Sequence, residues 1–241
     1  MTVIGVVCEG PTDYAAIESY LGGALSGIGR QVSFVDLQPQ IDQTGLAVSG
    51  AGWANALAWL KGNPLAARLA RYLGPGLFAG GLSSKRCDCI LVQIDSDNLG
   101  DFGFTNYIAS NFGATVNNHL DAADRFAEIQ KILLLACGLQ DIAHASVNRH
   151  ALFPAVENTE AWCVAAADPS HPNIESTDKT DLAILYSRHF GVIVGKTLPL
   201  AKVKSVLARR EYCKITLSQH GNILLACPQF NRAVAELTQV I

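Results

Sequence analysis

Apolar runs that end in acidic and turn-forming residues are the clearest pattern along the chain. Residues 3–8 are rich in Val and lead directly into Glu9, and residues 89–94 are nearly all apolar and lead into Asp95. Strands that are covered on both faces read as almost continuous apolar runs. Both segments are therefore predicted to be buried strands of a parallel sheet.

Helical spacing of apolar residues follows the first run. Ile17 and Leu21 lie four residues apart behind Thr12, which is a residue type that caps helix N-termini well. The pair Gly22-Gly23 and Gly27 are expected to break this helix. The first run and this segment together predict one βα unit.

The rest of the chain is interpreted by the same two periodicities, because alternation favours strands and a three-to-four-residue repeat favours helices. We predict further strands over residues 31–37 and 144–156, and helices over residues 53–73 with a break near Pro64, 120–139 starting near Asn117 and Asn118, 157–167, 182–190, 200–212 and 230–241. Strands alternate with helices in the first two-thirds. This order predicts an α/β fold with a mainly parallel, Rossmann-like sheet flanked by helices.

Domain organisation follows from where the alternation stops. Residues 1–168 are predicted to form the α/β core, with a probable helical insertion around residues 40–85. Residues 169–241 lack strand-like segments and are predicted to form a helical C-terminal extension packed on the core. The insertion is longer than a minimal core needs, so it could cover a site or bind a partner.

Composition narrows the class of protein. The chain has 241 residues, 49% of them hydrophobic, which suffices for a large core. No apolar run has the roughly 18–20 uncharged residues of a membrane helix, and seven cysteines scattered in apolar segments fit a reducing environment. We therefore expect a cytoplasmic protein without a membrane partner. The net charge of −3 means that any nucleic-acid surface must be a local patch.

Three carboxylates form the candidate chemical site. Glu9 follows the first strand, and Asp95 and Asp97 follow the other strong strand, with side chains on one face of an extended segment. The carboxyl ends of parallel strands share one edge of a sheet, so the three can meet. Clustered carboxylates favour a hard divalent cation, and oxygen ligands favour Mg²⁺ or Mn²⁺. Taken singly, each motif also fits an ordinary turn or helix cap.

Phosphate contacts are predicted at two places. Gly10 and Thr12 would place backbone N–H groups of a helix start beside the carboxylates. A basic segment follows later in the chain, and its candidate contacts to nucleic-acid phosphates are Lys202, Lys204, Arg209 and Arg210. Its ordinary interpretation is a solvated helix face. The functional interpretation is a phosphate-binding patch next to the acidic site, because positioning contacts are made away from the reacting atoms.

The two strand ends also carry a family resemblance. Residues 6–13, Val-Val-Cys-Glu-Gly-Pro-Thr-Asp, and residues 90–97, Ile-Leu-Val-Gln-Ile-Asp-Ser-Asp, resemble the two signature segments of the TOPRIM superfamily. That superfamily includes topoisomerases, bacterial primases, recombination proteins and the overcoming-lysogenization-defect nucleases. The resemblance implies a TOPRIM-like α/β fold. It also implies that Glu9 acts as a general acid or base and that Asp95 and Asp97 are Mg²⁺ ligands.

A softer resemblance extends further along the chain. Residues 154–166, with Glu157-Asn158-Thr159-Glu160-Ala161-Trp162, are similar to a segment of small stand-alone TOPRIM proteins that often lie beside prokaryotic phage-defence genes. It implies a further acidic metal ligand, either Glu157 or Glu160. Cys163 and Val164 replace the usual leucines. Trp162 is interpreted as a core residue rather than a base-stacking platform.

These observations predict a Mg²⁺- or Mn²⁺-dependent nuclease of TOPRIM type, acting on DNA or RNA and belonging to an anti-phage defence system. The main alternative is a non-catalytic or partner-activated effector module that binds nucleotide or nucleic acid, with the partner protein encoded nearby. Primase-like or strand-passing chemistry ranks last, because no tyrosine is placed by motif for covalent strand attachment. Homodimerisation is left open.

Overall fold

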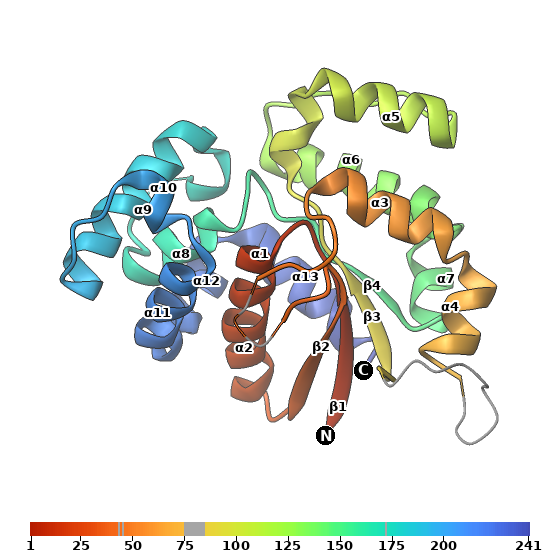
Figure 1. Cartoon of the computed structure of the whole chain (residues 1–241), viewed down its shortest axis with the longest axis horizontal. Helices are drawn as coiled ribbons and strands as arrows, with labels where there is room; N and C mark the ends of the chain where they lie inside the picture. The colour runs from red at the N-terminus through yellow and green to blue at the C-terminus, as the bar shows by residue number, and fades with distance from the viewer. Residues whose placement is uncertain (43, 45, 75–84, 172) are drawn as a thin grey trace.

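A four-stranded, all-parallel sheet forms the centre of the molecule. The computed structural model describes residues 1–42, 44, 46–74, 85–171 and 173–241. The strands are β1 (Thr2–Val7), β2 (Val32–Gln38), β3 (Cys89–Val92) and β4 (His150–Leu152), in the order β2-β1-β3-β4. All three pairings are parallel. The predicted α/β class with a parallel sheet flanked by helices is confirmed (Figure 1).

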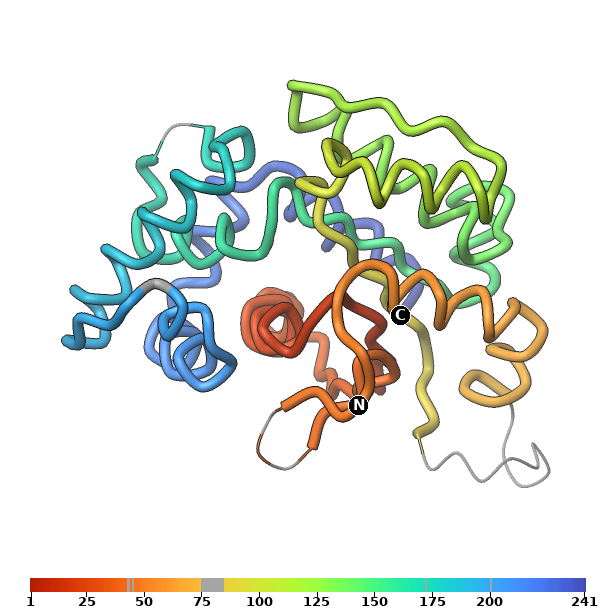
Figure 2. Tube along the Cα trace, turned by 45° about the horizontal axis from the view of Figure 1, so that its top comes forward, coloured from red at the N-terminus to blue at the C-terminus, as the bar shows by residue number. Residues whose placement is uncertain are grey.

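Helices cover both faces of this sheet. They are α1 (Pro11–Ala16), the π-helix η1 (Ile17–Leu21), α2 (Gly22–Gly27), α3 (Trp53–Gly62), α4 (Leu65–Arg71), the 3₁₀ helix η3 (Ser96–Gly100), α5 (Phe102–Phe112), α6 (Ala122–Cys137), α7 (Ile142–Val147), α8 (Glu160–Ala167), η4 (Ile174–Ser176), α9 (Lys179–Val194), α10 (Leu200–Val203), α11 (Val206–Thr216), η5 (Leu217–Gln219), α12 (His220–Ala226) and α13 (Pro228–Thr238). Figure 2 shows α9–α12 gathered on one side of α1, and α3–α6 on the other.

The first helical segment differs from the prediction at its start and at the Gly22-Gly23 pair, although it does end at Gly27. Helix α1 begins at Pro11 with Gly10 as its N-cap, so Thr12 lies inside the first turn and does not cap it. The segment also continues without interruption through Gly22 and Gly23 to residue 27. A Cβ atom at Gly23 would lie 3.1 Å from the ring of His220. These glycines therefore permit close packing instead of ending the helix.

Two other boundaries were wrong. The segment predicted as one strand over residues 144–156 divides into the end of α7 and the short strand β4. Helix α6 starts after Asp121, whose carboxylate accepts hydrogen bonds from the N–H groups of Ala123 and Asp124, rather than at Asn117 or Asn118. The break near Pro64 is confirmed, with α3 and α4 on either side. Part of the predicted insertion, residues 75–84, lies outside the described residues.

Alternation along the strands divides the core into two layers. Ile4, Val6 and Leu91 point into a first cluster shared with α1, η1 and most helices after residue 160. Ile90 and Val92 point into a second cluster shared with α3, α5 and α6. Successive side chains of a strand face opposite sides, so two helical layers are required.

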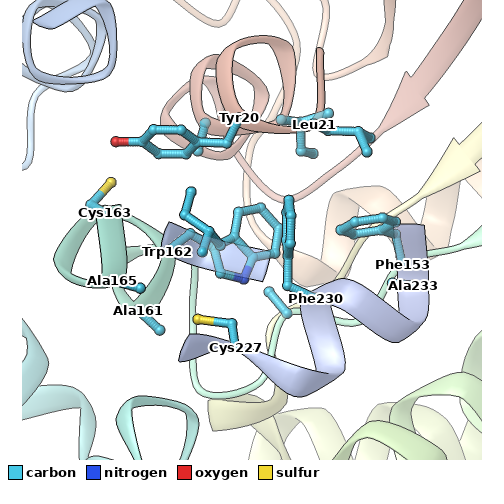
Figure 3. Close-up of a cluster of buried hydrophobic side chains, with 14 of the residues drawn as sticks. Tyr20, Leu21, Phe153, Ala161, Trp162, Cys163, Ala165, Cys227, Phe230 and Ala233 are labelled. Carbon is cyan, nitrogen blue, oxygen red and sulfur yellow. The ribbon is translucent and has the colours of Figure 1, made fainter. Parts of the chain in front are cut away.

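Trp162 lies in the first cluster, as predicted. Its side chain is fully buried and meets Phe153 and Phe230 edge to face, with ring centroids 5.7 and 4.9 Å away (Figure 3). Because Phe153 follows β4 and Phe230 belongs to α13, this packing joins the late helices to the sheet. All seven cysteines are buried and unpaired. No helix in the described part of the chain is long and apolar enough to cross a membrane.

An acidic cluster at the carboxyl ends of the strands

The predicted carboxylates converge at one edge of the sheet. Glu9 lies two residues beyond the end of β1, and Asp95 lies three residues beyond the end of β3. The pairing of β3 with β4 continues past their ends, because Asp95 bridges to Ala155 in parallel register. The Asp97 amide then donates to the Glu157 carbonyl at 3.0 Å. The three strand ends are thereby held in register.

Hydrogen bonds fix the first two carboxylates. One oxygen of Glu9, Oε1, accepts the backbone N–H of Asp95 at 2.8 Å and the side-chain amide of Asn98 at 2.7 Å. The amide of Gln93 donates to Asp95 Oδ1 at 2.6 Å. All of these donors are neutral. Hydrogen bonding orients both carboxylates, and no Lys or Arg in the described part of the chain forms an ion pair with either of them.

Asp13 is a fourth acidic member that the sequence analysis did not select as a site residue. It is buried in the first turn of α1, and its Oδ1 accepts the hydroxyl of Thr159 at 2.7 Å. Gly10 makes room for it, since a Cβ there would lie 3.3 Å from Asp13 Oδ2. The spacing was a usable signal, because a residue four positions after Glu9, across a tight turn, returns to the same strand end.

The environment disfavours ionisation of these groups. Burial, together with the charge of Asp13, raises the pKa of Glu9 to about 8. Burial raises the pKa of Asp95 well above its ordinary value, and Asp13 and Glu9 add to the effect. The pKa of Asp13 is raised to about 6, again mainly by burial. Desolvation and like charge act in the same direction here.

Basic residues surround this cluster and pair with its outer carboxylates. Arg125 of α6 forms an ion pair with the buried Glu157. Lys179 Nζ at the start of α9 lies 3.7 Å from Asp97 Oδ2. Glu160, in contrast, forms an ion pair with a buried arginine of α11, on the core side of the cluster. Thus both candidates for the further acidic ligand, Glu157 and Glu160, are engaged by guanidinium groups.

The charge of the site fits a cation, whereas its side chains are not gathered into a coordination shell. Among the described residues, Glu9, Asp13 and Asp95 form no ion pair with Lys or Arg. Their pKa values are raised mainly by burial, and for Glu9 and Asp95 neighbouring carboxylates add to the rise. In the same described ranges, however, no group of three or more His, Cys, Asp or Glu is placed to hold a metal ion. A metal bound here would need these carboxylates to reorient.

The predicted phosphate contacts have different outcomes. Gly10 and Thr12 are partly exposed beside Glu9, and Lys202 and Lys204 are exposed after α9. Lys204 lies near enough to Asp97 to favour its charged form. Arg210 is half-buried. Arg209 was wrongly predicted as a surface contact, because its side chain is 1% exposed and is paired with Glu160 at 2.5 Å.

Sequence periodicity explains this error. Residues 206–216 form one amphipathic helix, and Arg209 lies on the same face as Tyr212 and Cys213, which are both buried. The prediction took a charged side chain at that position to face solvent.

Comparisons with protein-family models, with curated proteins and with solved structures found no match to this chain.

Proposed function

We propose that this protein is a Mg²⁺- or Mn²⁺-dependent nuclease of TOPRIM type. The observation that carries the proposal is the meeting of Glu9, Asp95 and Asp97 at adjoining strand ends, where neither Glu9 nor Asp95 forms an ion pair with a described Lys or Arg. Several carboxylates in a desolvated place are costly unless a cation joins them. The resemblance of residues 6–13 and 90–97 to TOPRIM signature segments supports the same assignment.

The proposed roles follow from the contacts of each side chain. Asp95 and Asp97 would hold the metal, with Glu9 next to them. A metal bound there would supply neutralisation of a phosphate and a more acidic water. Asn98 and the Asp95 amide hold Glu9 Oε1 in place, which leaves Oε2 to accept or release a proton. The raised pKa of Glu9 suits a group that carries its proton near neutral pH.

A basic rim beside Asp97 would hold the nucleic acid. Lys179, Lys204 and Arg125 come from separate segments, and each favours the charged form of Asp97. The two lysines are exposed. They could contact phosphates on either side of the cleaved bond, while Arg125 also donates to the carbonyl of Ser96 at 2.9 Å and supports the loop. This rim replaces Arg209 in the proposed phosphate-binding patch.

The test is cleavage of single- and double-stranded DNA and RNA by the full chain with Mg²⁺ or Mn²⁺. Glu9→Gln and Asp95→Asn should each reduce the rate by about 10²–10⁴-fold, the usual range for a positioned acid–base group or its electrostatic partner. Glu175→Gln is a matched control, because Glu175 is also a buried carboxyl group with a raised pKa and contacts α13 instead of the cluster. Equal losses in all three variants would contradict the proposal.

The second candidate is an effector module that becomes competent only with a partner. The observation that favours it is the lack of a prearranged metal-holding group among the described residues. A folded wild-type protein that binds Mn²⁺ and nucleic acid but cleaves neither DNA nor RNA would favour this candidate. Involvement in phage defence and a neighbouring-gene partner belong to the same proposal. A homodimer remains a prediction for a sedimentation experiment.

A further inference from the structure

We infer that Arg209 is a positioning residue that fixes Glu160 and Asp13 against the acidic cluster, so that helix α11 completes the site. The expected effect of Arg209 on metal binding rests on the proposed function. Its role in holding Glu160 and Asp13 in place rests only on the contacts of Arg209.

Arg209 connects to the cluster through two separate acceptors. Its Nη2 donates to Glu160 Oε1 at 2.5 Å, and its Nη1 donates to Thr159 Oγ1 at 3.1 Å. Thr159 in turn donates to Asp13 Oδ1 at 2.7 Å. One planar guanidinium thus reaches both carboxylates, directly on one side and through a hydroxyl on the other.

The surroundings hold Arg209 in this position. Its guanidinium carbon lies 4.7 Å from the centre of the Tyr186 ring, so α9 covers the face that α8 leaves open. Thr159 is fully buried, and Glu160 has a side chain only 12% exposed. Arg209 spans two acceptors, Thr159 and Glu160, and the first of them donates in turn to Asp13.

The direction of the network matters for function. Asp13 is the strongest charged influence on both Glu9 and Asp95. Thr159 donates to Oδ1 of this carboxylate, and the Thr159 hydroxyl receives its own hydrogen bond from Arg209. The late helical segment is therefore joined to the strand ends by a defined chain of hydrogen bonds, in addition to apolar packing.

Binding of Mn²⁺ to the full chain, measured by calorimetry, tests the inference. Arg209→Met should weaken binding at least tenfold, and Thr159→Val, which removes only the bridging hydroxyl, should weaken it by a smaller factor. Arg209→Lys should recover only part of the loss, because an ammonium keeps the charge but not the planar two-pronged geometry. Full recovery by lysine would overturn positioning in favour of a charge effect alone.

Arg68→Met is the matched control, because Arg68 is an equally buried arginine that contacts α3, α6 and β4. It should leave Mn²⁺ affinity within about twofold of the wild type. If folded Arg209→Met binds Mn²⁺ as the wild type does, the inference is overturned.

Hydrogen exchange separates failure of this inference from failure of the proposed function. If the wild type binds no Mn²⁺, the proposed metal site fails, and the exchange of amides in residues 9–14 and 157–161 still decides the role of Arg209. Exchange there that is faster in Thr159→Val and Arg209→Met than the loss of overall stability of each variant explains, with no such excess in Arg68→Met, supports positioning. Unchanged protection in both segments contradicts it.

Discussion

Two arginines with almost no exposed surface show how differently the two layers of this molecule use a buried charge. Arg68 is surrounded by backbone carbonyls and a histidine, with the carbonyls of Asn63 and Cys137 at 2.6 and 2.5 Å and His150 Nε2 at 2.9 Å. Arg209 is surrounded by Thr159 and Glu160. No described carboxylate forms an ion pair with Arg68.

The difference follows from the end of the sheet that each arginine occupies. His150 is the first residue of β4, whereas Thr159 and Glu160 follow its carboxyl end. The carboxylates of the cluster also follow strand ends, so of these two arginines it is Arg209 that lies near them. Arg68 satisfies backbone groups of α3, the following turn and α6. A buried arginine is thus a stabilising crosslink in one layer and an arm of the candidate site in the other.

The largest expected effect is a loss of folding stability when Arg68 is replaced. Arg68→Met should lower the free energy of unfolding by about 3–4 kcal/mol, because several buried acceptors lose their donor at once. Denaturant titration measures it. A loss under about 1 kcal/mol would mean that water replaces the guanidinium and that the crosslink is dispensable.

The next effect is a loss of folding stability at acidic pH, through His150. Burial and the adjacent Arg68 lower the pKa of His150 to about 4. The unfolded chain therefore takes up this proton first, and stability that is fully present above about pH 6.5 is lost as the pH falls toward 4. We expect a loss of about 2–3 kcal/mol over that window. In His150→Gln the loss should be smaller; a profile unchanged by the substitution would assign the acid effect to other groups.

The opposite sign is expected in the layer that contains Arg209. Burial raises the pKa of Glu175 to about 7, although its carboxylate accepts the N–H groups of Gln229 and Phe230. Here the folded state keeps the proton longer. Stability is present below about pH 4.5 and is lost as the pH rises toward 7.

About 2–3 kcal/mol should be lost through Glu175 over that window, as for His150. Glu175→Gln should remove this slope while keeping one acceptor for α13. Thermal unfolding at pH 5 and pH 7.5 compares the two proteins, and an equal slope in both would refute the assignment.

The smallest expected effect tests whether the N-terminus of α6, which belongs to the same layer as Arg68, influences the acidic site. Asp121→Ala removes the cap of α6 and should cost about 1 kcal/mol of stability. Arg125 lies four residues later and pairs with Glu157. If α6 is rigid, nucleic-acid binding should change less than twofold; a larger change would show that the two layers are coupled through Arg125.

The sequence by itself determined strands β1, β2 and β3, the α/β class and the acidic strand ends. Continuous apolar runs at β1 and β3 and the residues that follow them are local features, and parallel topology brings strand ends together without further information. Helix boundaries at Gly22 and Asp121 were less accessible. They depend on whether a glycine contacts another helix and on which of several polar residues reaches the first N–H groups.

Only the tertiary structure decided which charged residues lie inside. Arg209 and Lys204 are both basic residues of one segment, yet the first is buried and the second exposed. An arginine can be buried at low cost only where hydrogen-bond acceptors surround it. For Arg209 these acceptors are Thr159 and Glu160, which lie some fifty residues earlier in the chain. Asp13 and Thr159 are likewise 146 residues apart. Hydrogen-bond satisfaction of a buried charge is a property of long-range contacts, and local sequence patterns do not encode it.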